Sequence, residues 1–281
     1  MHVIHGRATA PEMLEAGELN RFRNDGVLVH RVRFRDQYVQ LLLDQLPTLG
    51  DRVETVALEA DGETPRAFHG GYERNVVFNR LIRLDVLLGP VQQMLQDRAY
   101  VYQFKVNLKA AFVGDLWPWH QDYSFWAKED DMPSPRAVTV GIFLDEITEF
   151  NGPMYFIPGS HRGGCHDADQ DQCDAEGDSW LRHVGASLSY QTDLHKVVAL
   201  ARTHGLVAPK GQRGTIIFFD CNTVHASPAN ISPMQRRILF VTYNSVNNAP
   251  RNNIRPTFLV NRNVSPLEPL GGMELVESGP S

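Results

Sequence analysis

The chain has few cysteines, no long apolar run and no leader-like N-terminus. Its 281 residues include 3 cysteines, Cys165, Cys173 and Cys221, with no CxxC spacing. An odd, unpaired set argues against a disulfide framework and predicts a reducing, cytoplasmic location. No segment approaches the ~18 consecutive apolar residues of a membrane span, and residues 1–11 lack a signal peptide's apolar stretch. We therefore expect no membrane partner.

The charge pattern argues against a nucleic-acid-binding protein. The formal net charge is -6, and no basic run could follow a phosphate backbone, so we expect no nucleic-acid partner. Hydrophobic residues make up 42% of the chain, enough for a sizeable core, and the length fits one large domain. The oligomeric state is left open between monomer and homodimer.

Helical patterns dominate the first third of the chain and short β-rich runs the rest. Helical periodicity covers residues 12–23, 36–46, 75–88 and 91–95, with Gly89-Pro90 separating the last two and a short strand at 27–29. Later β-rich runs, punctuated by turn residues, are 100–108, 137–144, 154–157, 205–208, 215–220 and 238–243. This order predicts a mainly β fold: a jelly-roll or cupin-like barrel with flanking helices.

We expect a single domain over residues 1–281. A helical N-terminal buttress would cover about 1–98 and the β core about 99–247. Residues 162–203 form a long polar insert between two barrel strands. Loops of that size are functional or irregular padding, so a lid over the pocket and surface padding both stay open.

The tripeptide His120-Gln121-Asp122, followed much later by His225, carries most of the chemistry. Residues two apart on a strand point to the same side, so His120 and Asp122 could chelate one ion. Two histidines and a carboxylate form the facial triad of non-haem iron oxygenases. An isolated His-x-Asp arises by chance, but the neighbouring Trp117, Trp119 and Trp126 indicate a lined pocket.

Basic residues near this motif suit an anionic co-substrate. Arg236 and Arg237 follow His225, and neighbours on a strand face opposite sides, so only one of them should reach the site. Lys105 and Lys109 could also neutralise an anion, although we favour a solvated strand face for both.

Several ordered segments resemble one family. They are residues 102–109, Trp119-His120-Gln121-Asp122 with Trp126, Asp131-Met132-Pro133, residues 150–154 and 157–161, residues 218–225, and Tyr243-Asn244-Ser245-Val246. Together they resemble the phytanoyl-CoA dioxygenase (PhyH) family of Fe(II)/2-oxoglutarate-dependent oxygenases, closest to its ectoine hydroxylase branch. The likeness covers roughly residues 22–270.

The resemblance implies a double-stranded β-helix that uses Fe(II), 2-oxoglutarate and O2. It implies that His120, Asp122 and His225 bind the metal, and that Arg236 with Ser227 holds the distal carboxylate of 2-oxoglutarate. Further residues of the 2-oxoglutarate site would be Asn107, Trp117 and Thr139. The substrate pocket would be shaped by Gln103, Trp126, Ala137, Phe219 and Phe240.

The implied function is hydroxylation of a small polar molecule, a free amino acid or a cyclic amino-acid derivative. Asp122 favours hydroxylation over halogenation, because related halogenases have Gly or Ala there. Two alternatives stay open: the same iron chemistry giving desaturation, epoxidation or cyclisation in natural-product biosynthesis, and a non-catalytic cupin-like metal sensor. Trp117 and Thr139 stand where that branch has phenylalanine and serine, which leaves ectoine itself open as the substrate.

Overall fold

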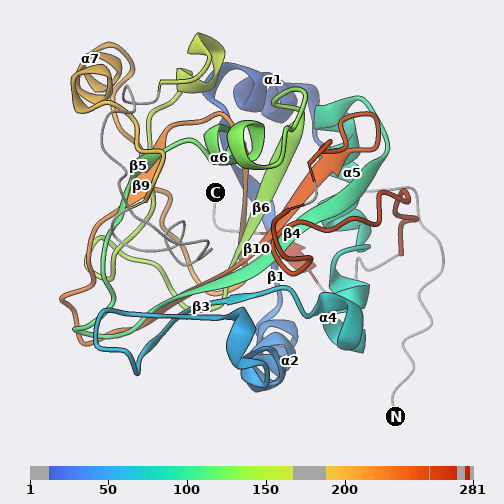
Figure 1. Cartoon of the computed structure of the whole chain (residues 1–281), viewed down its shortest axis with the longest axis vertical. Coiled ribbons are helices and arrows are strands. Elements are labelled where there is room, and N and C mark those ends of the chain that lie inside the picture. Colours follow the sequence, from blue (N-terminus) through green and yellow to red (C-terminus); the bar gives the residue numbers. More distant parts are fainter. Residues whose placement is uncertain (1–12, 167–187, 253, 271–275, 279–281) are drawn as a thin grey trace.

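A computed structural model describes residues 13–166, 188–252, 254–270 and 276–278. Across these residues the chain forms two antiparallel sheets with helices around them (Figure 1). The main sheet has eight strands in the order β11-β1-β8-β6-β10-β4-β3-β2. Its strands are β1 (Val27–Phe34), β2 (Val56–Leu58), β3 (Pro65–His69), β4 (Ala99–Lys109), β6 (Ala137–Phe143), β8 (Thr215–Asp220), β10 (Arg236–Ser245) and β11 (Val276–Ser278).

A smaller sheet faces the inner strands of the main sheet. It contains β5 (Trp117–His120), β9 (His225–Ser227) and β7 (Tyr155–Phe156), in the order β5-β9-β7. Phe156 of this sheet packs with Phe219 and Phe240 of the main sheet in one buried cluster. The space between the two sheets is therefore partly lined by aromatic residues, and it holds the candidate site.

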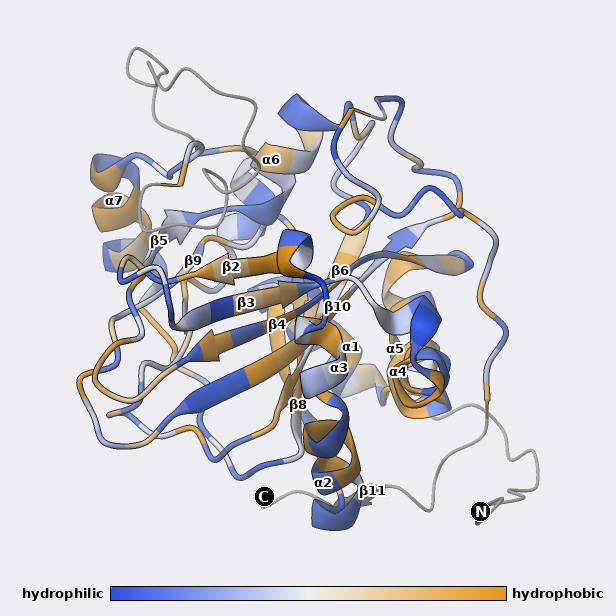
Figure 2. Ribbon diagram, turned by 60° about the horizontal axis from the view of Figure 1, so that its bottom comes forward, coloured by the Kyte–Doolittle hydropathy of each residue, from blue (hydrophilic) through white to orange (hydrophobic). Residues whose placement is uncertain are grey.

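Helices cover the opposite face of the main sheet. They are α1 (Ala16–Asp25), α2 (Asp36–Gln45), α3 (Pro47–Gly50), α4 (Val76–Leu81) and α5 (Asp85–Leu95), whereas α6 (Asp122–Glu129) and α7 (Leu194–His204) lie near the small sheet. Figure 2 shows α2 as amphipathic and α5 as largely hydrophobic. Their apolar side chains share one core with the outer face of β4, β6, β8 and β10. This core holds the main sheet rigid behind the site.

The predicted helix break at Gly89-Pro90 is wrong. The chain breaks at residues 82–84, and Pro90 lies inside α5. Leu87, Leu88 and Val91 around it are fully buried, and this packing offsets the one hydrogen bond that Pro90 cannot donate. Asn75 begins α4 by accepting hydrogen bonds from the backbone of Val77 and Phe78.

The N-terminal segment is more than a helical buttress, since β1, β2 and β3 join the main sheet. The two strands β2 and β3 are too short for a period-two pattern to stand out. Residues 205–208 are not a strand and make only one isolated bridge, from Val207 to Phe156. Within the predicted insert, 167–187 lie outside the described residues, as do Cys173 and the N-terminal residues 1–12, and 194–204 form α7.

No helix in the described part of the chain is both long and apolar enough to cross a membrane.

Candidate active site

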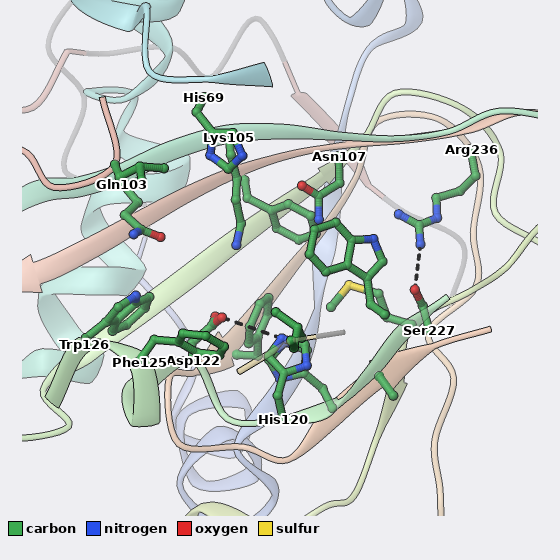
Figure 3. Close-up of a pocket in the computed structure, with 18 of the residues that line it drawn as sticks. His69, Gln103, Lys105, Asn107, His120, Asp122, Phe125, Trp126, Ser227 and Arg236 are labelled. Carbon is green, nitrogen blue, oxygen red and sulfur yellow. Dashed lines mark hydrogen bonds and ion pairs between the residues drawn. The ribbon is translucent and has the colours of Figure 1, made fainter. Parts of the chain in front are cut away.

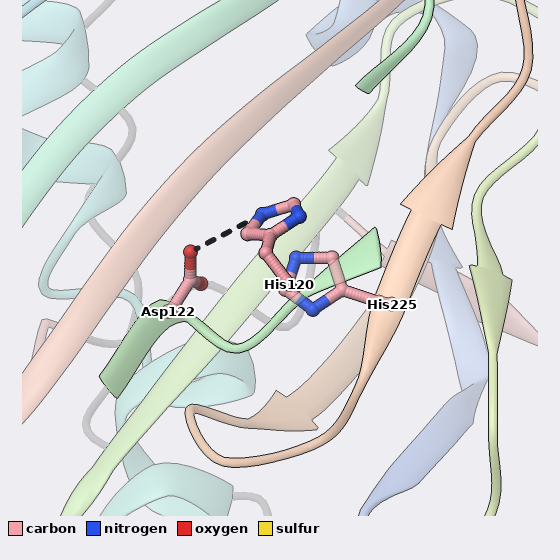
Figure 4. A group of neighbouring side chains, drawn as sticks. All are labelled: His120, Asp122 and His225. Carbon is pink, nitrogen blue, oxygen red and sulfur yellow. Dashed lines mark ion pairs between the residues drawn. The ribbon is translucent and has the colours of Figure 1, made fainter. Parts of the chain in front are cut away.

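Two histidines meet on the small sheet. His120 ends β5, His225 begins β9, and the strand register makes them direct partners. Their ring centroids are 4.2 Å apart. Asp122 opens α6, with Oδ1 3.9 Å from Nε2 of His120 (Figure 4). One ligand atom from each of the three buried side chains lies within 4.8 Å of the others, a spacing that one metal ion could bridge.

Asp122 does not share a strand with His120, which corrects the predicted geometry. The strand ends at His120 and the helix begins at Asp122. Gln121 between them is fully buried: its Nε2 donates to the Asn222 carbonyl at 2.6 Å, and its Oε1 accepts from the His166 backbone at 2.7 Å. Gln121 therefore connects two other loops by hydrogen bonds. The turn around it directs the side chains of His120 and Asp122 toward the same point.

The histidines are prepared to bind a cation. Nδ1 of His120 lies 2.6 Å from the Pro118 carbonyl, and Nδ1 of His225 lies 2.9 Å from the Thr223 carbonyl. A carbonyl only accepts, so the proton sits on Nδ1 and the Nε2 lone pair faces the cluster. Burial, with His225 nearby, lowers the pKa of His120 to about 3, and burial lowers the pKa of His225. Both rings are therefore neutral, as metal ligation requires.

Asp122 supplies the negative charge. Burial alone would raise its pKa, but the positive charge of Lys105 holds the pKa below its usual value. An ionised carboxylate and two neutral imidazoles fit a divalent metal such as iron, and they leave the other coordination positions for further ligands.

The cluster opens into a cavity of about 850 Å³ including its mouth, which lies between the two sheets. Arg236, Ser227 and Asn107 lie toward one end, Gln103 and Trp126 toward the other, and the His-Asp-His cluster between them (Figure 3). A cavity with polar groups at both ends and apolar walls suits a small molecule.

Arg236 is a charged residue at one end of the cavity. It is 1% exposed, and its Nε and Nη2 donate to the Gly152 carbonyl at 3.1 and 2.9 Å. Burial, with Arg66 nearby, lowers its pKa to about 9, which leaves it charged at neutral pH. The buried Oδ1 of Asn107 has no hydrogen-bond partner among the described residues. An anion with a second polar group would fit this end.

Arg237 points away from the cavity. Its Nη2 lies 2.6 Å from Oδ1 of Asp145 and its Nε donates to Oδ2 at 2.8 Å. The strand alternation thus separates the two arginines, and only Arg236 lines the pocket.

The two lysines of β4 are not on a solvated face, so that interpretation is wrong. Lys105 lines the cavity and extends toward Asp122 (Figure 3), and Lys109 is 1% exposed. The strand is internal, between β10 and β3, so its inward side chains meet the cavity or the core rather than solvent.

Most of the predicted site residues line one pocket. These are Gln103, Asn107, Trp117, His120, Asp122, Trp126, Phe219, His225, Ser227, Arg236 and Phe240. Thr139 and Ala137 are not among the lining residues. The hydroxyl of Thr139 pairs with that of Thr242 at 2.9 Å, and Ala137 packs in a cluster with Trp126 behind the wall.

Sequence reasoning missed other lining residues, namely His69, Met154, Leu188, Ala226, Arg255 and Leu259. Lys105 had a signal, because it alternates with Gln103 and Asn107 along β4. Arg255 had none, since it lies in irregular chain after the last long strand. It forms an ion pair with Asp130, with Nε donating to Oδ1 at 2.8 Å, and it places a second guanidinium in the pocket wall.

The comparisons with known proteins agree with this geometry. The phytanoyl-CoA dioxygenase (PhyH) family model matches residues 22–238. The L-proline trans-4-hydroxylase of Streptomyces griseoviridis is 38% identical over 251 residues, 89% of this chain and 94% of that one. The ectoine dioxygenase of Bordetella bronchiseptica is 31% identical over 291 residues, 98% of this chain and 92% of that one.

A solved structure extends the likeness. EctD from S. alaskensis with 2-oxoglutarate and 5-hydroxyectoine superposes with a TM-score of 0.79 at 30% identity, covering 96% of this chain and 92% of that one. The same protein with bound Fe also gives a TM-score of 0.79, at 29% identity and the same coverage.

The fold and the His-Asp-His cluster define a non-haem metal dioxygenase built on a double-stranded β-helix, which confirms the predicted fold class. The chain belongs to the phytanoyl-CoA dioxygenase (PhyH) family, as the sequence motifs indicated.

Proposed function

We propose that this enzyme is an Fe(II)- and 2-oxoglutarate-dependent hydroxylase of a free amino acid, with a cyclic one such as L-proline as the first candidate. The observation that carries the proposal is one pocket lined by a His-Asp-His cluster and by two arginines, Arg236 and Arg255. One cation serves the co-substrate and the other serves a substrate carboxylate.

The bound metal and co-substrate would supply the oxidation, in which O2 and 2-oxoglutarate give succinate, CO2 and a hydroxylated carbon. The chain's own residues hold and shield the reactants. His120, Asp122 and His225 bind the metal, and Arg236 with Ser227 binds the distal carboxylate of 2-oxoglutarate. Phe219 and Phe240 line the wall and keep water out.

The substrate end suits a molecule that carries both charges. Arg255 directs Nε and Nη2 at Asp130 and would donate to a substrate carboxylate through its remaining N–H groups. The indole of Trp126 could lie over an ammonium, a contact worth ~0.5–2 kcal/mol. Similarity to a proline hydroxylase over most of both chains supports an imino acid, and similarity to ectoine dioxygenases supports a cyclic scaffold.

The test is succinate formation by anaerobically purified enzyme supplied with Fe(II), 2-oxoglutarate and O2, across L-proline, ectoine, leucine, lysine and arginine. Stimulation by one compound, with a product one oxygen atom heavier, supports the proposal. A product two hydrogens lighter indicates desaturation or cyclisation instead. If the metal-loaded protein makes no succinate with any compound, the result would favour the alternative of a non-catalytic metal sensor.

We further propose a cytoplasmic location, which the odd number of cysteines without CxxC spacing supports. We also propose a monomer or homodimer, which size-exclusion chromatography with light scattering would test.

A further inference from the structure

One wall of the pocket includes a residue from the insert of residues 162–203. Among the residues that the structure describes, Leu188 is the one lining residue that belongs to this insert. Its side chain is buried, with 4% of the residue exposed. The described part of the insert therefore contributes to the site itself.

Leu188 belongs to the apolar wall at the substrate end of the pocket. It shares one buried apolar cluster with Phe125, Trp126 and Leu259, and all four side chains line the cavity. Figure 3 shows Phe125 and Trp126 at the end of the pocket away from Arg236. This wall would face the hydrocarbon part of a bound substrate.

The segment of residues 188–193, which we call the arm, is attached to the small sheet beside β5. Gln191 pairs with His120 in a single antiparallel bridge, and the N–H of Thr192 donates to the Trp119 carbonyl at 2.8 Å. Nε2 of Gln191 also donates to the Leu188 carbonyl at 3.1 Å. These hydrogen bonds fix the backbone of the arm relative to the strand that ends at His120.

Tyr190 attaches the arm to α6. Its hydroxyl donates to Oε1 of Glu129 at 2.6 Å. Its ring meets the edge of Phe125 with the centroids 5.0 Å apart, and Nζ of Lys128 lies 4.6 Å from the centre of the tyrosine ring. The arm is thus held against the same helix that carries Trp126, two residues away from Leu188.

The position of Leu188 makes the site sensitive to substrate size. Protein interiors are close-packed, so a buried wall side chain excludes any ligand group that would occupy its volume. A difference of one methylene in a hydrophobic pocket changes kcat/KM by about 10–200-fold. Cyclic amino acids that differ only in ring size carry the same two charges, so contacts with their charged groups do not distinguish them. An apolar wall does.

We propose that Leu188 is a specificity-determining residue that limits the size of the substrate's hydrocarbon part, and that Tyr190 is the positioning residue that holds Leu188 in the wall. The pocket thereby prefers L-proline over L-pipecolate, the homologue whose ring is one methylene larger. This inference rests on the proposed function and narrows its substrate class.

The test measures kcat/KM from succinate formation with L-proline and with L-pipecolate. In Leu188→Ala we expect the ratio of the two values to shift toward L-pipecolate by about tenfold or more, because the shorter side chain makes room for the extra methylene. Leu188→Met nearly keeps the side-chain volume and should retain the wild-type ratio. The KM for 2-oxoglutarate should stay within about twofold in both variants, since the wall lies at the other end of the pocket.

Matched variants separate a wall contact from general damage to the fold. Leu206→Ala makes the same change at a leucine that is 54% exposed, and it should leave the ratio unchanged. Leu188→Val removes less volume and replaces Leu188→Ala if that variant does not fold.

The role of Tyr190 has its own variants. Tyr190→Phe removes the hydroxyl that donates to Glu129, and it should shift the ratio in the same direction as Leu188→Ala but by a smaller factor. In the Leu188→Ala/Tyr190→Phe double variant the tyrosine change should add nothing, because the hydroxyl acts through the leucine.

The outcomes separate the claims. A wild type that prefers L-pipecolate, or an unchanged ratio in Leu188→Ala and Leu188→Val, would overturn the role of Leu188. An unchanged ratio in Tyr190→Phe, or additive effects in the double variant, would overturn the role of Tyr190. If the wild type uses another amino acid, the same ratio is measured between that compound and its homologue one methylene longer. A wild type that makes no succinate with any amino acid would overturn the proposed function, and this inference with it.

Discussion

At the scale of single residues, Asp122 is the one anionic group of the His-Asp-His cluster. In Asp122→Ala we expect bound metal to fall and hydroxylation to drop at least about hundredfold, because two neutral imidazoles hold a divalent ion weakly. Metal content and succinate release measure this. The matched change Asp131→Ala, at an exposed carboxylate, should leave both near the wild-type level. Near-normal turnover by Asp122→Ala would mean that the metal ligands are misassigned.

Substitutions of the two neighbouring arginines of β10 should likewise differ in their effects. Arg236→Ala removes the buried cation of the pocket, so we expect the Michaelis constant for the co-substrate to rise by at least about tenfold. Arg237→Ala breaks a partly exposed pair with Asp145 and should cost only about 1 kcal/mol of stability, with little change in that constant. Initial rates at varied co-substrate concentration and thermal melts measure the two effects. The reverse order would assign the anion site to Arg237.

At the scale of elements, the turn between β6 and β7 holds the Arg236 side chain in place. The Gly152 carbonyl accepts hydrogen bonds from both Nε and Nη2 of Arg236, and the φ of Gly152, 75°, lies in the left-handed region. A Cβ there would lie 2.7 Å from Lys109 and 3.0 Å from the Pro228 carbonyl. We expect Gly152→Ala to destabilise the fold by about 1–3 kcal/mol and to raise the Michaelis constant for the co-substrate.

Gly62 provides the matched control for that turn. Its φ is 74°, but nothing lies within 4 Å of a Cβ built there. Gly62→Ala should therefore show only the backbone strain, about 1 kcal/mol, with an unchanged Michaelis constant. Equal effects at the two glycines would show that the close contacts around Gly152 do not matter.

The element pattern was predictable where local signals were strong. The predicted strand 215–220 coincides with β8, and β4, β6 and β10 differ from their predicted ranges by a few residues at most. The small sheet was not predicted in full, since β5 and β9 are short and contain the site's polar residues. Their pairing depends on a contact between positions 120 and 225, which no local period reveals.

At the scale of the whole molecule, we propose a single domain. The N-terminal β1 pairs with β8, and β11 pairs with β1, so segments from both ends of the chain complete the main sheet. We expect one cooperative unfolding transition rather than two.

The free energy of unfolding should decrease in acid. Burial lowers the pKa of His69 and of His120 to about 3, and that of His30 to about 4. Because the unfolded chain binds these protons from about pH 6.5 downward and the folded chain does not, stability falls as the pH drops from 6.5 toward 4. The expected loss at pH 5 is on the order of 1–2 kcal/mol per histidine.

Denaturant titrations of the chelator-treated protein at pH 7 and pH 5 measure this loss. The variant His69→Gln removes one of the buried groups and should lose less stability between the two pH values. A loss as large as that of the wild type would show that His69 does not contribute.

The sequence by itself indicated the His-Asp-His candidates, a pair of arginines of which only one should reach the site, and the mainly β core; the resemblance to a family favoured Arg236. Those features depend on residue type, spacing and periodicity, which are local and chemically distinctive. Only the tertiary structure decided that Asp122 opens a helix, that Lys105 lines the pocket while Lys109 is buried, and that Arg255 reaches the pocket. Burial and charge environment arise from residues more than a hundred positions apart packing together, so no stretch of sequence carries them.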